Sequence, residues 1–179
     1  MADGQLMALA ENMMSAAAAQ TIEAQQVLTF DLHGETFALE AGLVREVLDL
    51  GTETAVPGAA PFVAAVINFR GRVIPLADLR LAFGLECAAP TLDSRIVVIE
   101  YDLDGDPFLI GLRADKVHEV TILETADIED APRVGLRWRS DFIRGLVRRD
   151  GDLIVVPDLA QIFATRGGAT GAVIPLLAS

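Results

Sequence analysis

The chain has 179 residues, of which 52% are hydrophobic and 22% are charged, a composition typical of a folded globular protein. Its formal net charge of -12 disfavours binding to nucleic acid and to anionic membranes, because both attract basic surfaces. The longest apolar runs are too short to span a bilayer, so no membrane insertion is expected, and with a single cysteine no internal disulfide can form, which favours a reducing cytoplasm. Protein partners or small ligands are the remaining classes.

Residues 1–26 are rich in alanine and methionine. Their apolar side chains recur at helical spacing and predict a short amphipathic helix that would be marginal alone in water. These side chains are Leu6, Leu9, Ala10, Met13 and Ala17. We treat the segment as an extension to the fold.

From Val27 the pattern changes to the alternation and β-branched runs of strands. VLTFDLHGETFALE predicts a hairpin that turns at His33-Gly34, and a helical turn near Ala41 and the strand VREVLDL follow it. RIVVIEYDLDGDPFLIGL predicts a second hairpin with Asp104-Gly105 at its tip. The next strand, KVHEVTIL, is similar to VREVLDL, so this order of elements occurs twice.

The segment that closes each half repeats without a gap at an offset of eighty residues. Phe62, Gly71, Ile74, Asp78, Leu79 and Phe83 correspond to Phe142, Gly151, Ile154, Asp158, Leu159 and Phe163. Such a match indicates an internal duplication. Each copy then reads hairpin, helical turn, strand, strand, glycine turn, strand and short helix.

The repeated residues predict local structure. Gly71 and Gly151 stand where a turn uses positive φ, and Asp78 and Asp158 can each cap a short helix. About five strands per copy would leave exposed edges unless each copy curls into a small barrel. We therefore predict a mainly β protein with two five-stranded barrels side by side and a groove between them. The predicted division is an extension at 1–26, barrels at 27–92 and 93–165, and a tail at 166–179.

The duplication also separates architecture from function. Gly71 is kept in both copies, whereas Asn68-Phe69-Arg70 becomes Arg148-Arg149-Asp150 in the second. Gly71 is therefore predicted to build the turn, and Arg70 is a candidate for a contact with another molecule. The alternative is that Arg70 is an ordinary solvated turn residue.

Arginines are concentrated between residues 133 and 149, after an acidic stretch at 100–130. Codon bias together with a solvated loop is one explanation. An arginine-lined contact with a carboxylate-rich partner is the other, because the planar guanidinium favours bidentate geometry.

Motifs for catalysis, metals or cofactors are not found, and none of these is expected. The acidic run YDLDGDPF fails as a calcium loop because Pro107 replaces the required glycine and Arg113 replaces the final glutamate. His33 and His118 lie in different copies, and Cys87 lacks a patterned histidine partner, so it is predicted to be a half-buried small apolar residue. Trp138 is predicted to pack at the edge of the core.

The run VINFRGRVIPLADLRLAFG, preceded by a hairpin and the VREV strand, resembles the CheW family of chemotaxis coupling proteins. The resemblance covers Val27 to Thr165. It implies two tandem SH3-like barrels and a non-catalytic adaptor that joins chemoreceptors to the histidine kinase CheA. It further implies that the receptor's hairpin tip lies along the groove, and that barrel ends meet the kinase's regulatory domain at receptor arrays on the inner membrane.

Where this sequence matches the family's motif, the resemblance implies residues that bind the receptor and the kinase. Phe69 departs from the leucine usual in the family, which implies a groove shaped for a particular receptor. The implied site residues are Arg70, Asn68, Phe69, Val44, Glu46, Val66 and Gly71.

The competing interpretation is a small-ligand-binding module that uses the cleft between the barrels. A closed pocket with convergent polar groups would favour a ligand, whereas an open apolar trough would favour a helical partner.

Overall fold

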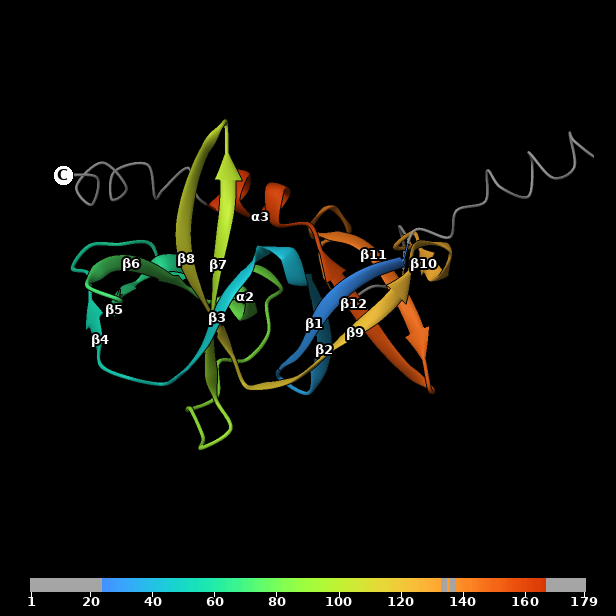
Figure 1. The fold of residues 1–179 in the computed structure, drawn as a ribbon, viewed down its shortest axis with the longest axis horizontal. Coiled ribbons are helices and arrows are strands. Elements are labelled where there is room, and N and C mark those ends of the chain that lie inside the picture. The colour runs from blue at the N-terminus through green and yellow to red at the C-terminus, as the bar shows by residue number, and fades with distance from the viewer. Residues whose placement is uncertain (1–23, 133–134, 136–137, 167–179) are drawn as a thin grey trace, which may run out of the picture.

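The computed structural model describes residues 24–166 apart from 133, 134, 136 and 137. The predicted N-terminal helix and C-terminal tail therefore lie almost entirely outside the described residues. The described chain is mainly β, with two six-stranded sheets side by side and short helices around them (Figure 1). Both predicted β subdomains are thus confirmed, with six strands in each sheet when the short strands β4 and β10 are counted.

Sheet A has the strand order β10-β11-β12-β2-β1-β9 and sheet B the order β4-β5-β6-β8-β7-β3. Sheet A consists of β10 (Ile128–Glu129), β11 (Ile143–Arg149), β12 (Asp152–Pro157), β2 (Glu35–Glu40), β1 (Ala24–Leu32) and β9 (Lys116–Glu124). Sheet B consists of β4 (Glu53–Ala55), β5 (Ala65–Phe69), β6 (Arg72–Ala77), β8 (Asp106–Ala114), β7 (Arg95–Leu103) and β3 (Val44–Asp49). The helices are η1 (Ala41–Leu43), η2 (Pro61–Val63), α2 (Leu79–Ala82), η3 (Thr125–Asp127), η4 (Ser140–Phe142) and α3 (Leu159–Arg166).

The two copies exchange their hairpins. The β1–β2 hairpin of the first copy completes the sheet of the second through parallel pairing of β2 with β12, and the β7–β8 hairpin pairs in parallel with β6 of the first. The ranges 27–92 and 93–165 therefore mark the two sequence copies, and the boundary at residue 92 does not divide the sheets. A repeat shows which strands are alike, but strand partners are chosen by tertiary packing.

Four hairpin turns share one backbone geometry. In each, a non-glycine residue with φ between 49° and 55° precedes a glycine with φ between 78° and 91°. Positive φ at both central residues suits the twist of two-residue hairpins. The turns are His33-Gly34, Arg70-Gly71, Asp104-Gly105 and Asp150-Gly151. The predicted positive φ of Gly71 and Gly151 is confirmed.

The predicted caps are also present. Asp78 Oδ1 accepts a hydrogen bond from the Arg80 amide at 3.1 Å, and Asp158 Oδ1 accepts one from the Gln161 amide at 3.0 Å. Each aspartate amide in turn donates to the carbonyl of the repeated phenylalanine, Phe62 or Phe142. The side-chain caps explain why aspartate is repeated in both copies, and the burial of Phe62 and Phe142 in the core explains why phenylalanine is repeated.

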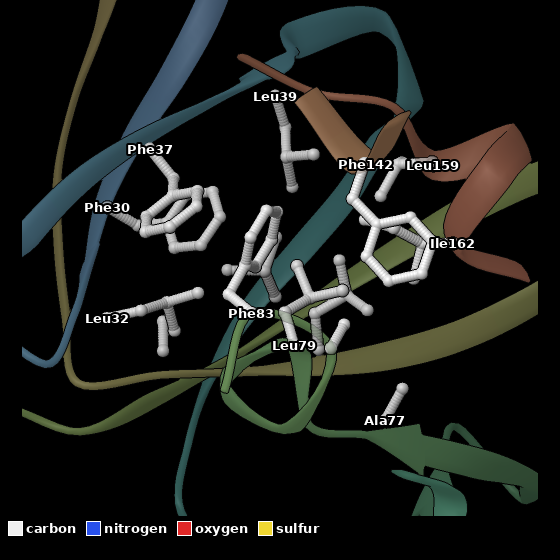
Figure 2. Close-up of a cluster of buried hydrophobic side chains, with 14 of the residues drawn as sticks. Phe30, Leu32, Phe37, Leu39, Ala77, Leu79, Phe83, Phe142, Leu159 and Ile162 are labelled. Atoms are coloured by element: carbon white, nitrogen blue, oxygen red, sulfur yellow. The ribbon is translucent and has the colours of Figure 1, made fainter. Parts of the chain in front are cut away.

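The largest apolar core lies between the two sheets (Figure 2). Phe30 and Phe37 from the first hairpin meet Phe83 and Phe142 there, and Trp138 packs at its edge as predicted. Two smaller cores fill the curled sheets. One lies in sheet B around Ile67 and the other in sheet A around Val147 and Ile154. The shared hairpin strands thus bury side chains on both faces. In the described part of the chain, no helix is both long and apolar enough to cross a membrane.

Candidate functional site

The turn between β5 and β6 presents Arg70 to solvent. Asn68 Oδ1 accepts a hydrogen bond from the Gly71 amide at 2.9 Å, which fixes the turn across its two positive-φ residues. The Arg70 side chain is 74% exposed. The guanidinium therefore stands outside the barrel, as its assignment as a contact residue requires.

Arg70 is held by an ion pair with Glu46 of β3. Its Nη2 and Nε donate to Glu46 Oε2 at 2.7 and 2.9 Å. β3 is an edge strand of sheet B and β5 lies next to the opposite edge, so the pair joins two distant parts of the curled sheet. The Arg70 Cζ atom also lies 5.6 Å from the centre of the Phe69 ring. The charge is thereby oriented without being removed from water.

The other predicted site residues are placed differently. Phe69 is only 8% exposed and packs in the core of sheet B. The expectation that Phe69 shapes a binding groove directly does not fit this burial; an alternating strand pattern sends residues 65, 67 and 69 inward. Val44 packs against the core between the sheets, while Val66 faces Thr54 and Pro75 in the strand ladder. The structure thus brings together Glu46, Arg70 and the turn.

The second copy also has an arginine at the corresponding turn, but at a different position and with different hydrogen-bond acceptors. Arg149, which aligns with Phe69, donates from Nη1 to Thr121 Oγ1 and to the Ile122 carbonyl of edge strand β9. Both sheets therefore have an arginine that reaches from this turn to the opposite edge strand, but with different acceptors. Aligning the two copies does not show this relation, because the two arginines are one position out of register.

A cavity of about 210 Å³ lies at the seam between the sheets. Leu39, Leu43 and Leu159 contribute apolar walls, and Tyr101 comes from sheet B. Arg144 Nη1 and Glu40 Oε1 form an ion pair of 2.8 Å, and both residues line the cavity. Leu43 directly precedes Val44, so this cavity adjoins the β3 strand that carries Glu46. It is the feature that corresponds to the predicted groove.

A larger cavity of about 770 Å³ opens at the turn end of sheet A. Its walls include the carboxylates of Asp31, Glu119 and Asp152, and His118 Nε2 lies 2.8 Å from Asp31 Oδ2. Its lining residues belong to sheet A and its turns, so it is not a cleft between the barrels. Among the described residues no cluster of histidine, cysteine and carboxylate side chains could hold a metal ion.

Arg80 forms a buried ion cluster that the sequence analysis did not identify. Its Nη2 lies 2.7 Å from Asp78 Oδ2 and its Nη1 lies 3.0 Å from Asp115 Oδ1. The hydrogen bonds that the Arg80 guanidinium donates to Asp78 raise the pKa of Arg80. Asp115 Oδ2 also accepts from the His33 amide at 2.6 Å. The cluster therefore ties α2 to the point where the chain crosses from sheet B to sheet A.

Cys87 is exposed, so the prediction of a half-buried residue is wrong. Its Sγ lies 3.7 Å from Asp78 Oδ2. Although the residue is exposed, neighbouring atoms displace part of the water around its sulfur, and this desolvation together with the negative charge of Asp78 raises the pKa of Cys87. The prediction failed because Cys87 lies in an exposed loop, and leaving one small apolar side chain in contact with water costs little free energy.

Part of the arginine-rich segment is neutralised inside the chain. Arg139 Nη2 lies 2.5 Å from Asp141 Oδ2, and Arg144 pairs with Glu40. Arg133 and Arg137 lie outside the described residues. An arginine-lined contact with a carboxylate-rich partner stays a prediction.

The family model of the CheW-like domain matches residues 26–167. The chain is 27% identical over 151 residues to the chemotaxis protein CheW of Rhizobium meliloti, covering 84% of this chain and 95% of the relative. It is 29% identical over 136 residues to the chemotaxis protein CheW of Bacillus subtilis, covering 75% and 83%. The crystal structure of the scaffolding protein TtCheW from Thermoanaerobacter tengcongensis superposes with a TM-score of 0.70 at 30% identity, covering 80% of this chain and 90% of that one.

Proposed function

Because the chain belongs to the CheW family, we propose that it is a chemotaxis scaffold that couples chemoreceptors to the histidine kinase CheA. The family domain spans nearly all of the described residues, and the similar solved protein is named a scaffolding protein. The coupling role is that of an adaptor, which holds partners in register without chemistry of its own. Its place is the cytoplasm, at receptor arrays on the inner membrane.

The proposed receptor contact is the seam beside β3. Leu43 and Tyr101 offer apolar contact in the seam cavity, where a helical hairpin tip could bury apolar side chains. Val44 follows Leu43, Glu46 lies further along β3, and its ion pair with Arg70 connects this strand to the β5–β6 turn. Val66, Asn68 and Gly71 support this turn and the face of β5 next to it.

The observation that carries this assignment is the exposed, oriented guanidinium of Arg70. A free arginine side chain loses conformational entropy when it binds, whereas Arg70 is already held by Glu46 and the Phe69 ring. A charge-assisted bond to a receptor carboxylate or carbonyl then costs less ordering. Phe69 acts here as a support for Arg70 from inside the core.

The proposed kinase contacts are the barrel ends, opposite the matching barrels of the CheA regulatory domain. Each such interface is expected to be modest in area and to gain strength from the repeated contacts of an array. Rigid-body shifts between packed modules would transmit the signal.

The test is a binding assay with the two partners separately. The full chain is immobilised, and a CheA regulatory domain or a receptor cytoplasmic fragment is passed over it. The proposal expects saturable binding of both. Arg70→Ala is expected to weaken binding of the receptor fragment. Its matched control is Arg45→Ala, which removes an exposed ion pair between β3 and Glu100 of β7 and should leave binding unchanged. Absence of binding to either partner, at concentrations that saturate a known adaptor, would contradict the coupling role.

A further inference from the structure

Edge strand β9 carries two apolar side chains that the described fold leaves uncovered. Val120 and Ile122 are each 57% exposed and alternate along one face of the strand. On that face Val120 lies opposite Leu28 of β1, and Val117 lies opposite Phe30. Leu28 and Phe30 both belong to the core between the sheets. The two residues therefore extend the apolar core outward along the β1–β9 ladder.

The duplication shows that the sheet itself does not require this strip. The VREVLD strand of the first copy aligns with VHEVTI, so Val47 corresponds to Val120 and Asp49 to Ile122. Val47 is less exposed, at 39%, and Asp49 forms an ion pair of 3.3 Å with Arg95. One copy thus carries a charge where the other carries isoleucine. An exposed isoleucine on an edge strand also invites association, which proteins normally prevent.

The strip leads to the point where the N-terminal extension joins the fold. Ala24, the first residue of β1, lies opposite Glu124, two positions from Ile122 on β9. At strand spacing Ile122 is about 7 Å along the ladder from that point. Residues 1–23 are tethered there, and tethering replaces a bimolecular encounter by a high local concentration.

The sequence of the extension suits the strip in pattern and in length. Leu6, Leu9, Ala10, Met13 and Ala17 fall on one face at helical spacing. A helix over residues 6–17 would be about 18 Å long, and the strip from Ile122 to Val117 is about 17 Å long at strand spacing. Residues 18–23 are enough to connect the two, since six extended residues span about 20 Å.

We propose that the N-terminal extension folds back on its own chain and covers Val120 and Ile122 with its apolar face. The extension would then protect the β9 edge from pairing with other chains.

The test compares methyl spectra of the full chain with those of a chain carrying Leu9→Asp and Met13→Asp. Both substitutions lie outside the described fold, so the sheets should be unaffected. The methyl resonances of Val120 and Ile122 are expected to shift, while those of Val47, the corresponding position in the other copy, stay in place. Unchanged Val120 and Ile122 resonances would overturn the proposal.

A distance measurement separates folding back from the other occupants. A nitroxide is placed on the polar face of the extension by Ser15→Cys in a Cys87→Ser background. It should broaden the Val120 methyl signals, independently of protein concentration, and the broadening should be lost with Ile122→Asp, which copies Asp49. Broadening that disappears on dilution would mean that a second copy covers the strip, and the proposal would be wrong.

Discussion

The Arg70 guanidinium and the Glu46 carboxylate form an ion pair with an Nη2–Oε2 distance of 2.7 Å, although 24 residues separate them in the chain. The pair joins the β5–β6 turn to edge strand β3. Since the arginine side chain remains 74% exposed, its contribution to stability is small even though its orientation is well defined. Stability and partner binding can therefore be separated at this position.

Arg70→Ala is expected to leave the fold nearly unchanged and to weaken coupling. Loss of an exposed ion pair costs at most about 1 kcal/mol, which in a domain of this size lowers Tm by less than about 4 °C. Loss of one charge-assisted contact to a receptor should lower receptor-dependent kinase stimulation about tenfold. Thermal unfolding and a reconstituted receptor–kinase assay measure the two effects.

Arg45→Ala is the control for this experiment. Arg45 lies one residue before Glu46 and donates to Glu100 through Nε and Nη2, both at 3.2 Å. It should change neither Tm nor kinase stimulation appreciably. Normal coupling by the Arg70 variant, or equal loss in both variants, would remove Arg70 from the site.

Gly71→Val is expected to destabilise the protein through the backbone alone. Gly71 has φ +81°, and a Cβ built there meets nothing within 4 Å. A β-branched residue resists this conformation, at a cost of about 1–3 kcal/mol. Gly51 also has open space around it but no left-handed φ, so Gly51→Val is the matched control. Urea unfolding should separate the two variants; similar midpoints would contradict the turn assignment.

Local features of the fold could be predicted because each depends on a few neighbouring residues. The turn at Gly71 and the cap at Asp78 follow from φ preference and from a side chain beside free amides. The exchange of hairpins could not be predicted, since the parallel pairs Leu76–Gly111 and Ile154–Thr36 join segments distant in sequence. Tertiary packing selects those pairs.

The candidate site was predicted only in part, because some of its contacts join residues that are distant in sequence. Arg70 was identified because the second copy lacks it, and its exposure agrees with that argument. The burial of Phe69 was missed because the family motif carries no information about which side of the strand faces the core. The Arg80 cluster was missed because its acceptor Asp115 lies 35 residues away.

Cys87 is expected to react slowly with alkylating reagents for an exposed thiol. Local desolvation of the sulfur and the nearby Asp78 carboxylate both disfavour the thiolate and raise the pKa of Cys87, and the thiolate is the reactive form. The pH–rate profile of iodoacetamide modification should therefore have its midpoint above the value of about 8.5 for a free cysteine. The same protein unfolded in urea is the control and should show the ordinary midpoint. A folded-state midpoint at or below that of the unfolded chain would contradict the arrangement of Cys87 and Asp78.

Asp78→Asn is expected to cost much more stability than Asp158→Asn, although the two aspartates cap equivalent helices. Asparagine caps a helix about as well as aspartate, so both substitutions keep the cap. At position 78 the substitution also removes the carboxylate that faces the buried Arg80 guanidinium at 2.7 Å and leaves Asp115 as its charged partner. Breaking a buried pair in this way costs about 3 kcal/mol. The side chain of Asp158 accepts only from the Gln161 amide among the contacts described, so the change there should stay within about 0.5 kcal/mol. Urea denaturation of the two variants measures the difference. Equal loss in both would mean that the Arg80 charge is solvated in solution, and that the cluster does not hold α2 against the crossing between the sheets.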